Sequence, residues 1–563
     1  MFTSANDILL VIALDLFLFL VLFGAFALYR KLRSQSVNLS TEISVKQPYM
    51  NEAEHSAYEI GKKVLNMELE EIYTEMGEWA YVYLSLHRFI LFSMIALAVP
   101  GTGLLIIYYY GRSDTSLDTI HVTSISHVIN QSDVLIVSVV FMVYFSAVVY
   151  GFGFKFLLNI LRSRSQSHFF NSQDTVIMVR GIPKKHNSEY ITDVMKNCIG
   201  EHFKQSIKLV YTVPYLVIPY KHFVKVKNNE KKLILLNHDL EMNGESTVIK
   251  KKCKKVDGLT YYEKKRFWNL TKVEETRKKF LGFNAGVGFI MFTNNVSASN
   301  FLKSGFDINH SLISDKWEIM IAPVSHDILW ENIGFDRTYA LLLKIFLNLT
   351  FILIFLVIIT PSTFEEQLQI YLDYTGLTQL VVGTLAVSLP GLVLIIYQLI
   401  ILPPVVNFMV KNEKHIKKHT FVTSSLKKYF FFLLFYTLIF PILGLQFLGV
   451  IELFINGNWQ FELGTKVNYT GELFFVFMIH QAFLKNGFDL LVASKYILSA
   501  FKALLLANSQ AEKKLCFEAE PFEFDFELAV SLNAFVITCG LSVIFPIILM
   551  PALIFFSIRV RSI

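Results

Sequence analysis

Apolar residues in this chain fall into two blocks that flank a long polar stretch. Three long apolar segments come first, a lysine-rich stretch covers about 161–337, and further apolar segments run almost to the C-terminus. A run of about 20 apolar residues is enough for a helix to cross a bilayer. The pattern predicts a mainly α-helical, polytopic membrane protein with a cytosolic α+β module inserted between membrane helices three and four.

The N-terminal block, 1–160, is predicted to hold three membrane helices and a cytosolic linker. Arg30, Lys31 and Arg33 follow the first helix, and because Lys and Arg are enriched on the cytosolic side, the N-terminus is expected outside. No basic segment precedes this helix, which favours an anchor over a cleaved signal peptide. Asp15 within it is either a helix–helix contact or a functional group. The predicted spans are 8–29, 89–110 and 134–158.

The C-terminal block, 338–563, is predicted to hold six more membrane helices, nine in total. A basic loop is expected at 411–428. Pro546 and Pro551 interrupt the last apolar run, and because proline breaks helices, a hairpin is expected that returns Arg559 and Arg561 to the cytosolic side. The predicted spans are 338–360, 377–402, 429–454, 472–499 and the two arms of 528–558.

The polar stretch, 161–337, predicts the strand and helix order of a ferredoxin-like split β-α-β unit. RNA-recognition modules share this order but stack bases on aromatic side chains at fixed strand positions. Val287 and Ile177 stand at those positions here, while Phe289 and Phe292 should face opposite sides of the sheet. We therefore expect no nucleic-acid partner. The predicted strands are 175–179, 207–212, 286–293 and 317–322, and the predicted helices are 189–203, 261–280 and 296–303.

Composition supports a membrane protein and argues against an enzyme. The chain is 53% hydrophobic and 17% charged, with 52 Phe and 25 Tyr, whereas soluble domains carry about 25% charged residues. Its net charge of +6 is concentrated in basic blocks such as 250–255, which are either solvated cytosolic loops or contacts with anionic lipid. No P-loop, Gly-X-Ser-X-Gly or His-Glu-X-X-His motif is present, so we expect transport, permeation or lipid handling.

Cysteines and sequons refine this topology. The four cysteines lie in segments predicted not to be outside, without Cys-X-X-Cys or Cys/His spacing, so we expect no disulfide, no metal site and no cofactor. Asn130 and Asn468 begin Asn-X-Ser/Thr sequons in loops expected outside, and are candidate glycosylation sites.

Polar residues gather on the predicted seventh helix. Gln481, Lys485 and Asp489 are four residues apart and share one helix face, with Asn486 beside them. A charge at mid-bilayer costs about 2.5–3.5 kcal/mol unless it is paired or faces water. The stripe is therefore either a pore lining or a buried ion pair. Because a basic side chain in a narrow pore repels cations, we expect Lys485→Gly to increase cation current.

Glycine and proline within the predicted spans are candidate gating hinges, since membrane helices tolerate kinks at these residues. Close helix packing through small residues is the alternative. Helices that can tilt or straighten respond to bilayer thickness, because mismatch costs fractions of a kcal/mol per Å. The candidates are Gly487, Gly383, Pro390, Pro441, Pro546 and Pro551.

Several stretches resemble the OSCA and transmembrane-protein-63 family of stress-gated cation channels, relatives of the anoctamins. They occur in the family's order over about 50–558. The stretches are GEWAYVYLSLHRF at 77–89, TVIMVRGIP at 175–183, WEIMIAPVSHDILWEN at 317–332, the helix at 474–491, ANSQAEKK at 507–514 and FEFDF at 522–526.

The resemblance implies an eleven-helix fold with a pore inside one protomer, opened by membrane tension or osmotic stress. Permeant inorganic cations would include calcium, and the protein would be a monomer or homodimer surrounded by membrane lipids, in the plasma membrane or, alternatively, an endolysosomal one. A lipid scramblase and a non-conducting shortened relative are the alternatives. The chain departs from the family in ending before its last two helices, and in carrying Lys485 and Glu527 where glycine is usual.

Overall fold

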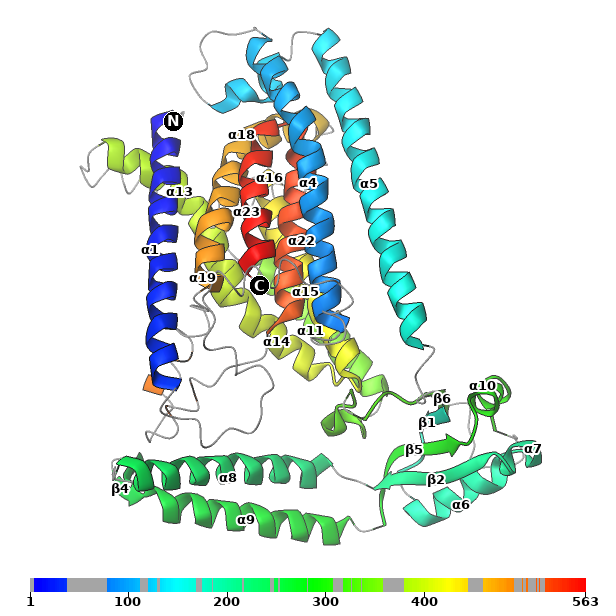
Figure 1. Ribbon diagram of the computed structural model, residues 1–563. Coiled ribbons are helices and arrows are strands. Elements are labelled where there is room, and N and C mark those ends of the chain that lie inside the picture. Colours follow the sequence, from blue (N-terminus) through cyan, green and yellow to red (C-terminus); the bar gives the residue numbers. More distant parts are fainter. Residues whose placement is uncertain are drawn as a thin grey trace.

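The computed structural model describes residues 5–37, 78–111, 120–128, 132–168, most of 175–357, 379–443, 459–490 and 522–562, and a few isolated residues between 499 and 516. A block of upright helices lies above an α/β module, and a long helix pair extends from the module beneath the block (Figure 1).

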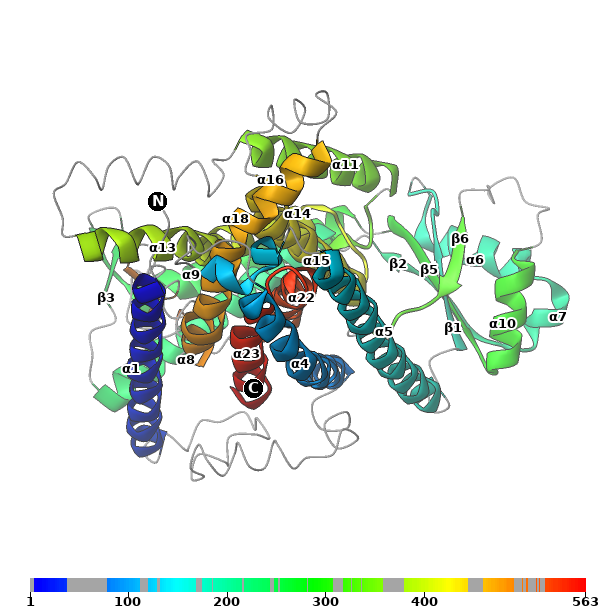
Figure 2. The same cartoon turned by 90° about the horizontal axis from the view of Figure 1, so that it is seen from above.

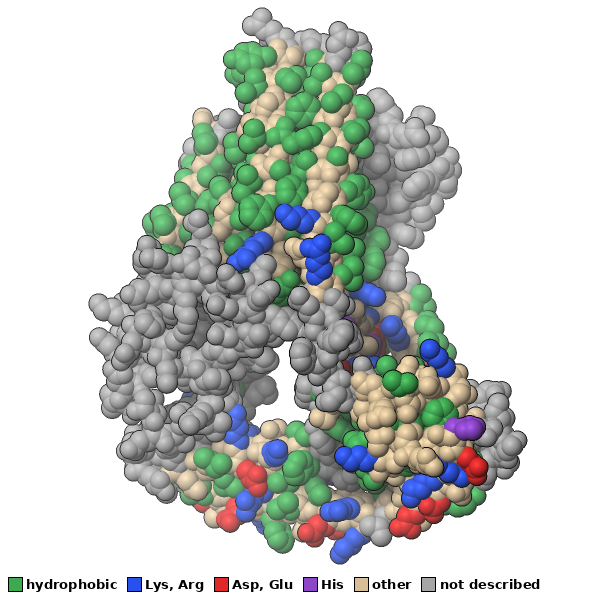
Figure 3. Space-filling model, turned by 45° about the vertical axis from the view of Figure 1, so that its right-hand side comes forward, with side chains coloured by type: hydrophobic (Ala, Val, Ile, Leu, Met, Phe, Trp, Pro, Cys, Tyr) green, Lys and Arg blue, Asp and Glu red, His purple; other side chains and the backbone are tan. Residues whose placement is uncertain are grey.

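The N-terminal part of the helix block consists of α1 (Ala5–Val37), α4 (Glu78–Tyr110) and α5 (Ser132–His168). In both views, α1 and α5 lie on opposite flanks of the central helices (Figures 1 and 2). Hydrophobic side chains cover the outer surface of the block, with Lys and Arg below them (Figure 3). Within the described residues, six helices are long and apolar enough to cross a membrane: Asn6–Ala25, Trp79–Tyr110, Val134–Arg162, Ser388–Asn412, Lys418–Ile442 and Phe524–Leu541.

Three helices of the C-terminal part change from α to π geometry in mid-course. The π-helical turns are Tyr397–Ile401, Leu434–Ile439 and Gln481–Lys485. Such turns are rare and are frequent at functional sites. The α-helices of this part are α11 (Arg337–Val357), α13 (Gln379–Ile396), α14 (Leu402–Asn412), α15 (Lys418–Leu433), α16 (Phe440–Leu443), α18 (Trp459–His480), α19 (Asn486–Leu490), α22 (Phe524–Leu541) and α23 (Leu549–Ser562).

The last apolar run forms the expected hairpin. After α22 the chain turns through Pro546–Ile548 into α23, and Arg559 near the end of α23 reaches Glu527 near the start of α22, so the two helices are antiparallel. Among the described residues, apolar side chains of α4, α18, α22 and α23 form the largest buried cluster together with others from α1, α13, α14 and α15. The sequence does not predict the burial of Arg559, whose side chain is enclosed by the helix block.

Other boundaries also differ from those predicted. The basic loop is only Glu413–Lys417 long, because α15 begins at Lys418. Gly383 and Pro390 lie inside the continuous helix α13, and the change of geometry follows seven residues after the proline. Asn468 lies within α18 rather than in a loop. Asn130 is outside the described residues.

The α/β module contains a four-stranded sheet in the order β2-β5-β1-β6, with all neighbours antiparallel. The strands are β1 (Val176–Arg180), β2 (Ile207–Pro214), β5 (Asn284–Phe292) and β6 (Glu318–Ile321). Helices α6 (Ser188–Cys198) and α10 (Asn295–Ser304) cover one face. Buried apolar residues recur in α6 at Ile191, Val194, Met195 and Cys198, the spacing that gives a helix a single apolar stripe.

The second face of the sheet is covered by the chain itself. Phe289 stacks on Tyr211 with ring centroids 5.4 Å apart. Ile328 and Ile333, from the segment after β6, pack on this face together with Ile416 from the α14–α15 loop. The face on which an RNA-recognition module stacks bases is therefore occupied by protein.

The insert between β2 and β5 is a pair of long helices, α8 (Val217–Asn243) and α9 (Gly258–Lys279), with a short hairpin at their far end formed by β3 (Val248–Lys251) and β4 (Lys254–Asp257). The sequence predicted α9, whereas α8 was included only in an undivided charged insert. The two helices pack along each other and extend away from the sheet (Figure 1).

The α14–α15 loop ties the module to the helix block. Leu329 donates its backbone N–H to Ile416 O at 2.7 Å, and Lys418 donates to Asp327 O at 2.7 Å. Asp327 also accepts the backbone N–H of His419 through its side chain, at 2.9 Å. This loop joins two helices that are long and apolar enough to cross a membrane, so the position of the module is linked directly to theirs.

Glu413 fixes the same loop from inside. Its buried carboxylate forms an ion pair with Lys428 Nζ at 2.6 Å and accepts hydrogen bonds from His415 (2.8 Å) and Ser424 (2.9 Å). Burial by itself would raise the pKa of this carboxyl group, but these partners lower it from 4.5 to about 2.

Glu413→Gln is expected to destabilise the protein by on the order of 3 kcal/mol at neutral pH, the equivalent of that pKa difference. Because the folded pKa lies below the unfolded one, this stability is fully present above about pH 4.5 and is lost as the pH falls through about 2. Thermal unfolding of the purified protein across this pH range measures it.

Glu275→Gln is the matched control, since Glu275 pairs with Lys272 at the same 2.6 Å distance but is exposed to solvent. An exposed pair contributes about 0–1 kcal/mol. Equal shifts in unfolding temperature for both variants would contradict the assignment of Glu413.

Candidate functional site

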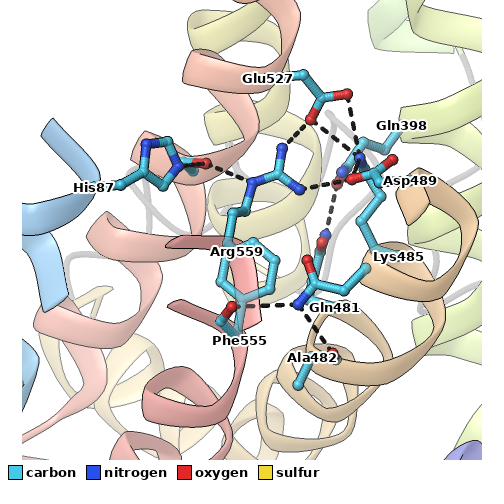
Figure 4. Close-up of polar contacts among 11 residues, drawn as sticks. His87, Gln398, Gln481, Ala482, Lys485, Asp489, Glu527, Phe555 and Arg559 are labelled. Atoms are coloured by element: carbon cyan, nitrogen blue, oxygen red, sulfur yellow. Dashed lines mark hydrogen bonds and ion pairs between the residues drawn. The ribbon is translucent and has the colours of Figure 1, made fainter. Parts of the chain in front are cut away.

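Two positive and two negative side chains meet in the interior of the helix block (Figure 4). Lys485 Nζ contacts Asp489 and lies 3.2 Å from Glu527 Oε2. Arg559 reaches the same two acids, with Nη1 2.6 Å from Asp489 Oδ2 and Nη2 in contact with Glu527. We call these four residues the charge cluster. Its formal charge is zero, and each cation touches both carboxylates.

The charge cluster joins three helical segments that are distant in sequence. Lys485 ends the π-helical turn after α18 and Asp489 lies in α19, whereas Glu527 lies in α22 and Arg559 in α23. The side chains of Lys485 and Arg559 are 0% and 2% exposed, and those of Asp489 and Glu527 are 22% and 14% exposed. The cations are therefore sealed from solvent, and the acids lie at the more accessible edge.

Neutral groups orient Arg559 from the other side. Its Nε donates to Ser531 Oγ at 3.2 Å, and Ser531 Oγ lies 2.8 Å from His87 Nε2. His87 Nδ1 is 2.8 Å from Tyr83 O, a pure acceptor, so Nδ1 carries the proton and Nε2 accepts from the serine. The guanidinium is thereby linked through α22 to α4. Aromatic rings add contacts to the cations, Phe526 to Lys485 and Phe555 to Arg559, each at 5.6 Å.

The three π-helical turns bring further polar and aromatic groups together. Gln481 Nε2 donates to Gln398 Oε1 at 2.7 Å, which joins the first and third turns. The rings of Tyr397 and Tyr436 stack 3.7 Å apart, which joins the first and second. These side chains form a buried polar and aromatic layer next to the charge cluster. A π-helical turn changes the direction of the side chains that follow it, compared with a regular α-helix.

The structure brings together only part of the polar stripe that the sequence predicts. Lys485 and Asp489 pair, but Gln481 faces Gln398 instead, because the π-helical turn between them breaks the regular four-residue register. Asn486 donates to Ala482 O at 3.0 Å and to Phe555 O at 3.2 Å, and so links α19 to α23.

The sequence reasoning did not assign Glu527 and Arg559 to the site. The resemblance implies that Glu527 and Lys485 each stand where the family has glycine, and the structure places these two residues in contact. The opposite charges of Lys485 and Glu527 were the feature of the sequence from which this contact could have been predicted. Arg559 offered none, because a basic residue after the last apolar run is also what a cytosolic flank contains.

The candidate hinges have different surroundings. A Cβ atom at Gly487 would lie 2.8 Å from Leu22 Cδ1, so this glycine permits α19 to pack closely on α1. Pro441 lies in α16, just after a π-helical turn, and Pro546 and Pro551 flank the beginning of α23. Their role as gating hinges stays a prediction.

Two family models match adjacent parts of the chain. One, described as "Calcium-dependent channel, 7TM region, putative phosphate", matches residues 337–561. The other, described as "Cytosolic domain of 10TM putative phosphate transporter", matches residues 174–332. A mouse protein named "Mechanosensitive cation channel TMEM63A" is 21% identical over 98% of this chain and 73% of its own length. The chain belongs to the OSCA and TMEM63 family.

Further members of the OSCA and TMEM63 family match over a shorter span. The Arabidopsis thaliana "Hyperosmolality-gated Ca2+ permeable channel 3.1" and the Gallus gallus "Mechanosensitive cation channel TMEM63B" are each 23% identical to 54% of the chain. These alignments cover 43% and 40% of those relatives. Membership makes the chain a multi-pass membrane protein, and the family's names point to channels rather than enzymes.

Proposed function

We propose that the protein is a mechanically or osmotically gated, non-selective cation channel that passes calcium, with its pore inside one protomer beside α18 and α19. The observation that carries this proposal is the charge cluster, which places four ionisable groups inside a helix block whose outer surface is hydrophobic (Figure 3). Such groups are costly in a membrane and mark ion or substrate pathways. The names of the relatives support the same function.

The charge cluster has no net charge, so Lys485 within it need not repel cations. An unpaired ammonium would repel cations, but two carboxylates lie against this one. Gln481 and Asn486 are also buried. We interpret this arrangement as the closed state, in which the ion pairs occlude the pathway and opening separates α22 and α23 from α19.

The finer architecture belongs to the same proposal. We infer nine membrane helices with the N-terminus outside, and the division into 1–160, 161–337 and 338–563. We also infer a ferredoxin-like cytosolic domain, supported by the antiparallel strand order β2-β5-β1-β6. The plasma membrane is the proposed location, and a monomer or homodimer the proposed assembly.

Patch recording from liposomes that contain only this protein tests the channel directly, and a fluorescent lipid-flip assay on the same liposomes tests the scramblase alternative. Stretch-activated current without lipid flip supports the proposal. Lipid flip without current would replace it with scrambling, and neither activity would leave a non-conducting relative.

Water access to α18–α19 is a separate prediction. In a background without the four native cysteines, Gln481→Cys and Asp489→Cys should react with a water-soluble thiol reagent faster under stretch than at rest. Phe483→Cys is the control, because Phe483 faces the ring of Phe19 on α1, 6.1 Å away. Equal reactivity at all three positions, with no effect of stretch, would contradict a pathway here.

A further inference from the structure

A second buried ionic pair joins the first helix to the pore-side helices, apart from the charge cluster. Asp15 lies in the middle of the apolar run of α1, on the same stripe as the buried Ile8 and Val11, and is 1% exposed. His480 is the last residue of α18, directly before the π-helical turn, and is also 1% exposed. Nothing in the proposed pathway requires a histidine at this place.

The His480 ring is held at both nitrogens. Nδ1 lies 2.5 Å from Asp15 Oδ2, and Nε2 lies 3.1 Å from the backbone oxygen of Ser388 in α13. The ring also fits closely against α13, since a Cβ atom at Gly391 would lie 2.8 Å from His480 Cδ2. One imidazole therefore connects α1, α13 and α18.

Counting hydrogens shows that this arrangement needs a bound proton. A backbone oxygen only accepts, so Nε2 must carry a hydrogen to bond Ser388, and a second hydrogen must lie between Nδ1 and Asp15. A neutral imidazole beside an ionised carboxylate has one hydrogen in all, so one contact would set two lone pairs against each other. With both hydrogens the pair is uncharged overall, whichever partner holds the shared one.

Burial favours the protonated pair as well. Within the described residues, Asp15 Oδ1 has no hydrogen-bond partner, and an unpaired buried carboxylate oxygen is costly when ionised. Loss of the proton would leave a net negative charge among apolar side chains and would weaken either the contact with α1 or the contact with α13.

The helices around this site carry other ionisable residues. The helices packed against this site are α1, α13, α18, α19, α23 and the π-helical turn after α18. The described part of α13 has no ionisable residue, and Asp7 of α1 lies two helical turns from Asp15. Part of the charge cluster lies on the same helices, and its Lys485, Asp489 and Arg559 pair with each other and with Glu527. The remaining charged residues of these elements are Arg30, Lys31 and Arg33 in the last part of α1, Glu462, Lys466 and Glu472 in α18, and Arg561 at the end of α23.

We propose that Asp15 and His480 form a proton-binding site that clamps α1 onto α13 and α18, so that proton loss releases α1. The ligand is a hydrogen ion, and the pathway that it controls is the one in the proposed function, on which this inference rests. At alkaline pH the clamp opens and less tension is required for current, whereas acid pH holds α1 in place.

Disulfide crosslinking tests the clamp without any measurement of current. The Cβ atom built at Gly487 lies 3.5 Å from Leu22 Cβ, within the range that a disulfide spans. Leu22→Cys with Gly487→Cys, in the background without native cysteines, therefore reports whether α1 is docked. The crosslinked fraction should fall severalfold from acid to alkaline pH, relative to the same cysteine pair in an Asp15→Asn, His480→Gln background.

This comparison removes the effect of pH on thiol reactivity, because both proteins carry the same two cysteines and the substituted pair does not titrate. The same crosslinking ratio at every pH would overturn the clamp. Patch recording then adds the functional readout: stretch-activated current should rise with pH in the parent and be independent of pH in the Asp15→Asn, His480→Gln double variant. Absence of current in all variants would count against the channel alone, because the crosslinking result stands without it.

Discussion

Replacing Arg559 with methionine should be the most destabilising single change in the helix block. Arg559 contacts the mostly buried carboxylates of Asp489 and Glu527, and the hydroxyl group of Ser531. Its removal leaves Asp489 and Glu527 to share Lys485, and removing one side of a buried ion pair costs about 3–5 kcal/mol. Thermal unfolding of the purified protein, together with the amount that reaches the membrane, measures the effect.

Two further variants serve as controls for Arg559→Met. Lys303→Met removes an exposed cation from α10 and should change stability by less than about 0.5 kcal/mol. Arg559→Lys keeps the charge but cannot bridge two carboxylates with a planar fork, so it should fall between the two. If Arg559→Met unfolds at the same temperature as Lys303→Met, the charge cluster does not hold these helices together.

The second large effect concerns ion selectivity and follows from the neutrality of the charge cluster. Lys485→Gly gives the cluster a net charge of minus one and should raise cation current, as the sequence predicts. Glu527→Gly gives a net charge of plus one and should shift permeation toward anions. Two unit charges 4 Å apart interact by about 4 kcal/mol at an effective dielectric constant of 20, so a tenfold change in the cation-to-anion permeability ratio, about 1.4 kcal/mol, is within reach.

The double variant is the decisive member of this series. Lys485→Gly with Glu527→Gly restores zero charge, so its reversal potential should return to that of the parent protein. Surface expression is matched for all variants, and Lys411→Gly, at an exposed position at the end of α14, controls for the loss of a distant lysine. A double variant that keeps the selectivity of either single variant would show that the two residues act independently.

Local patterns predicted much of the architecture. The two apolar blocks, the strands of the module and the α22–α23 hairpin each depend on short-range signals, namely hydrophobic runs, alternation and paired prolines. The sequence therefore predicts those parts of the fold whose determining residues lie within a single helix, strand or turn.

The charge cluster did not follow from such signals, because three of its four contacts join residues 32 to 70 positions apart. Lys485 with Asp489 was visible as a four-residue spacing, but Glu527 is 42 residues away from Lys485 and Arg559 is 70 away from Asp489. The π-helical turns were also not predicted, since no residue type marks them as proline marks a kink. Their effect is to rotate Gln481 away from the face that regular α-helical periodicity assigns to it.

The short loop from Glu413 to Lys417 has a consequence for how the protein could be controlled from the cytoplasm. It terminates two of the helices that flank the buried polar layer, and its backbone bonds to the segment that follows the sheet. A force applied to the sheet through a bound antibody fragment or small domain would therefore be transmitted to the ends of these helices. Such a force would move the helix ends without any change in the bilayer.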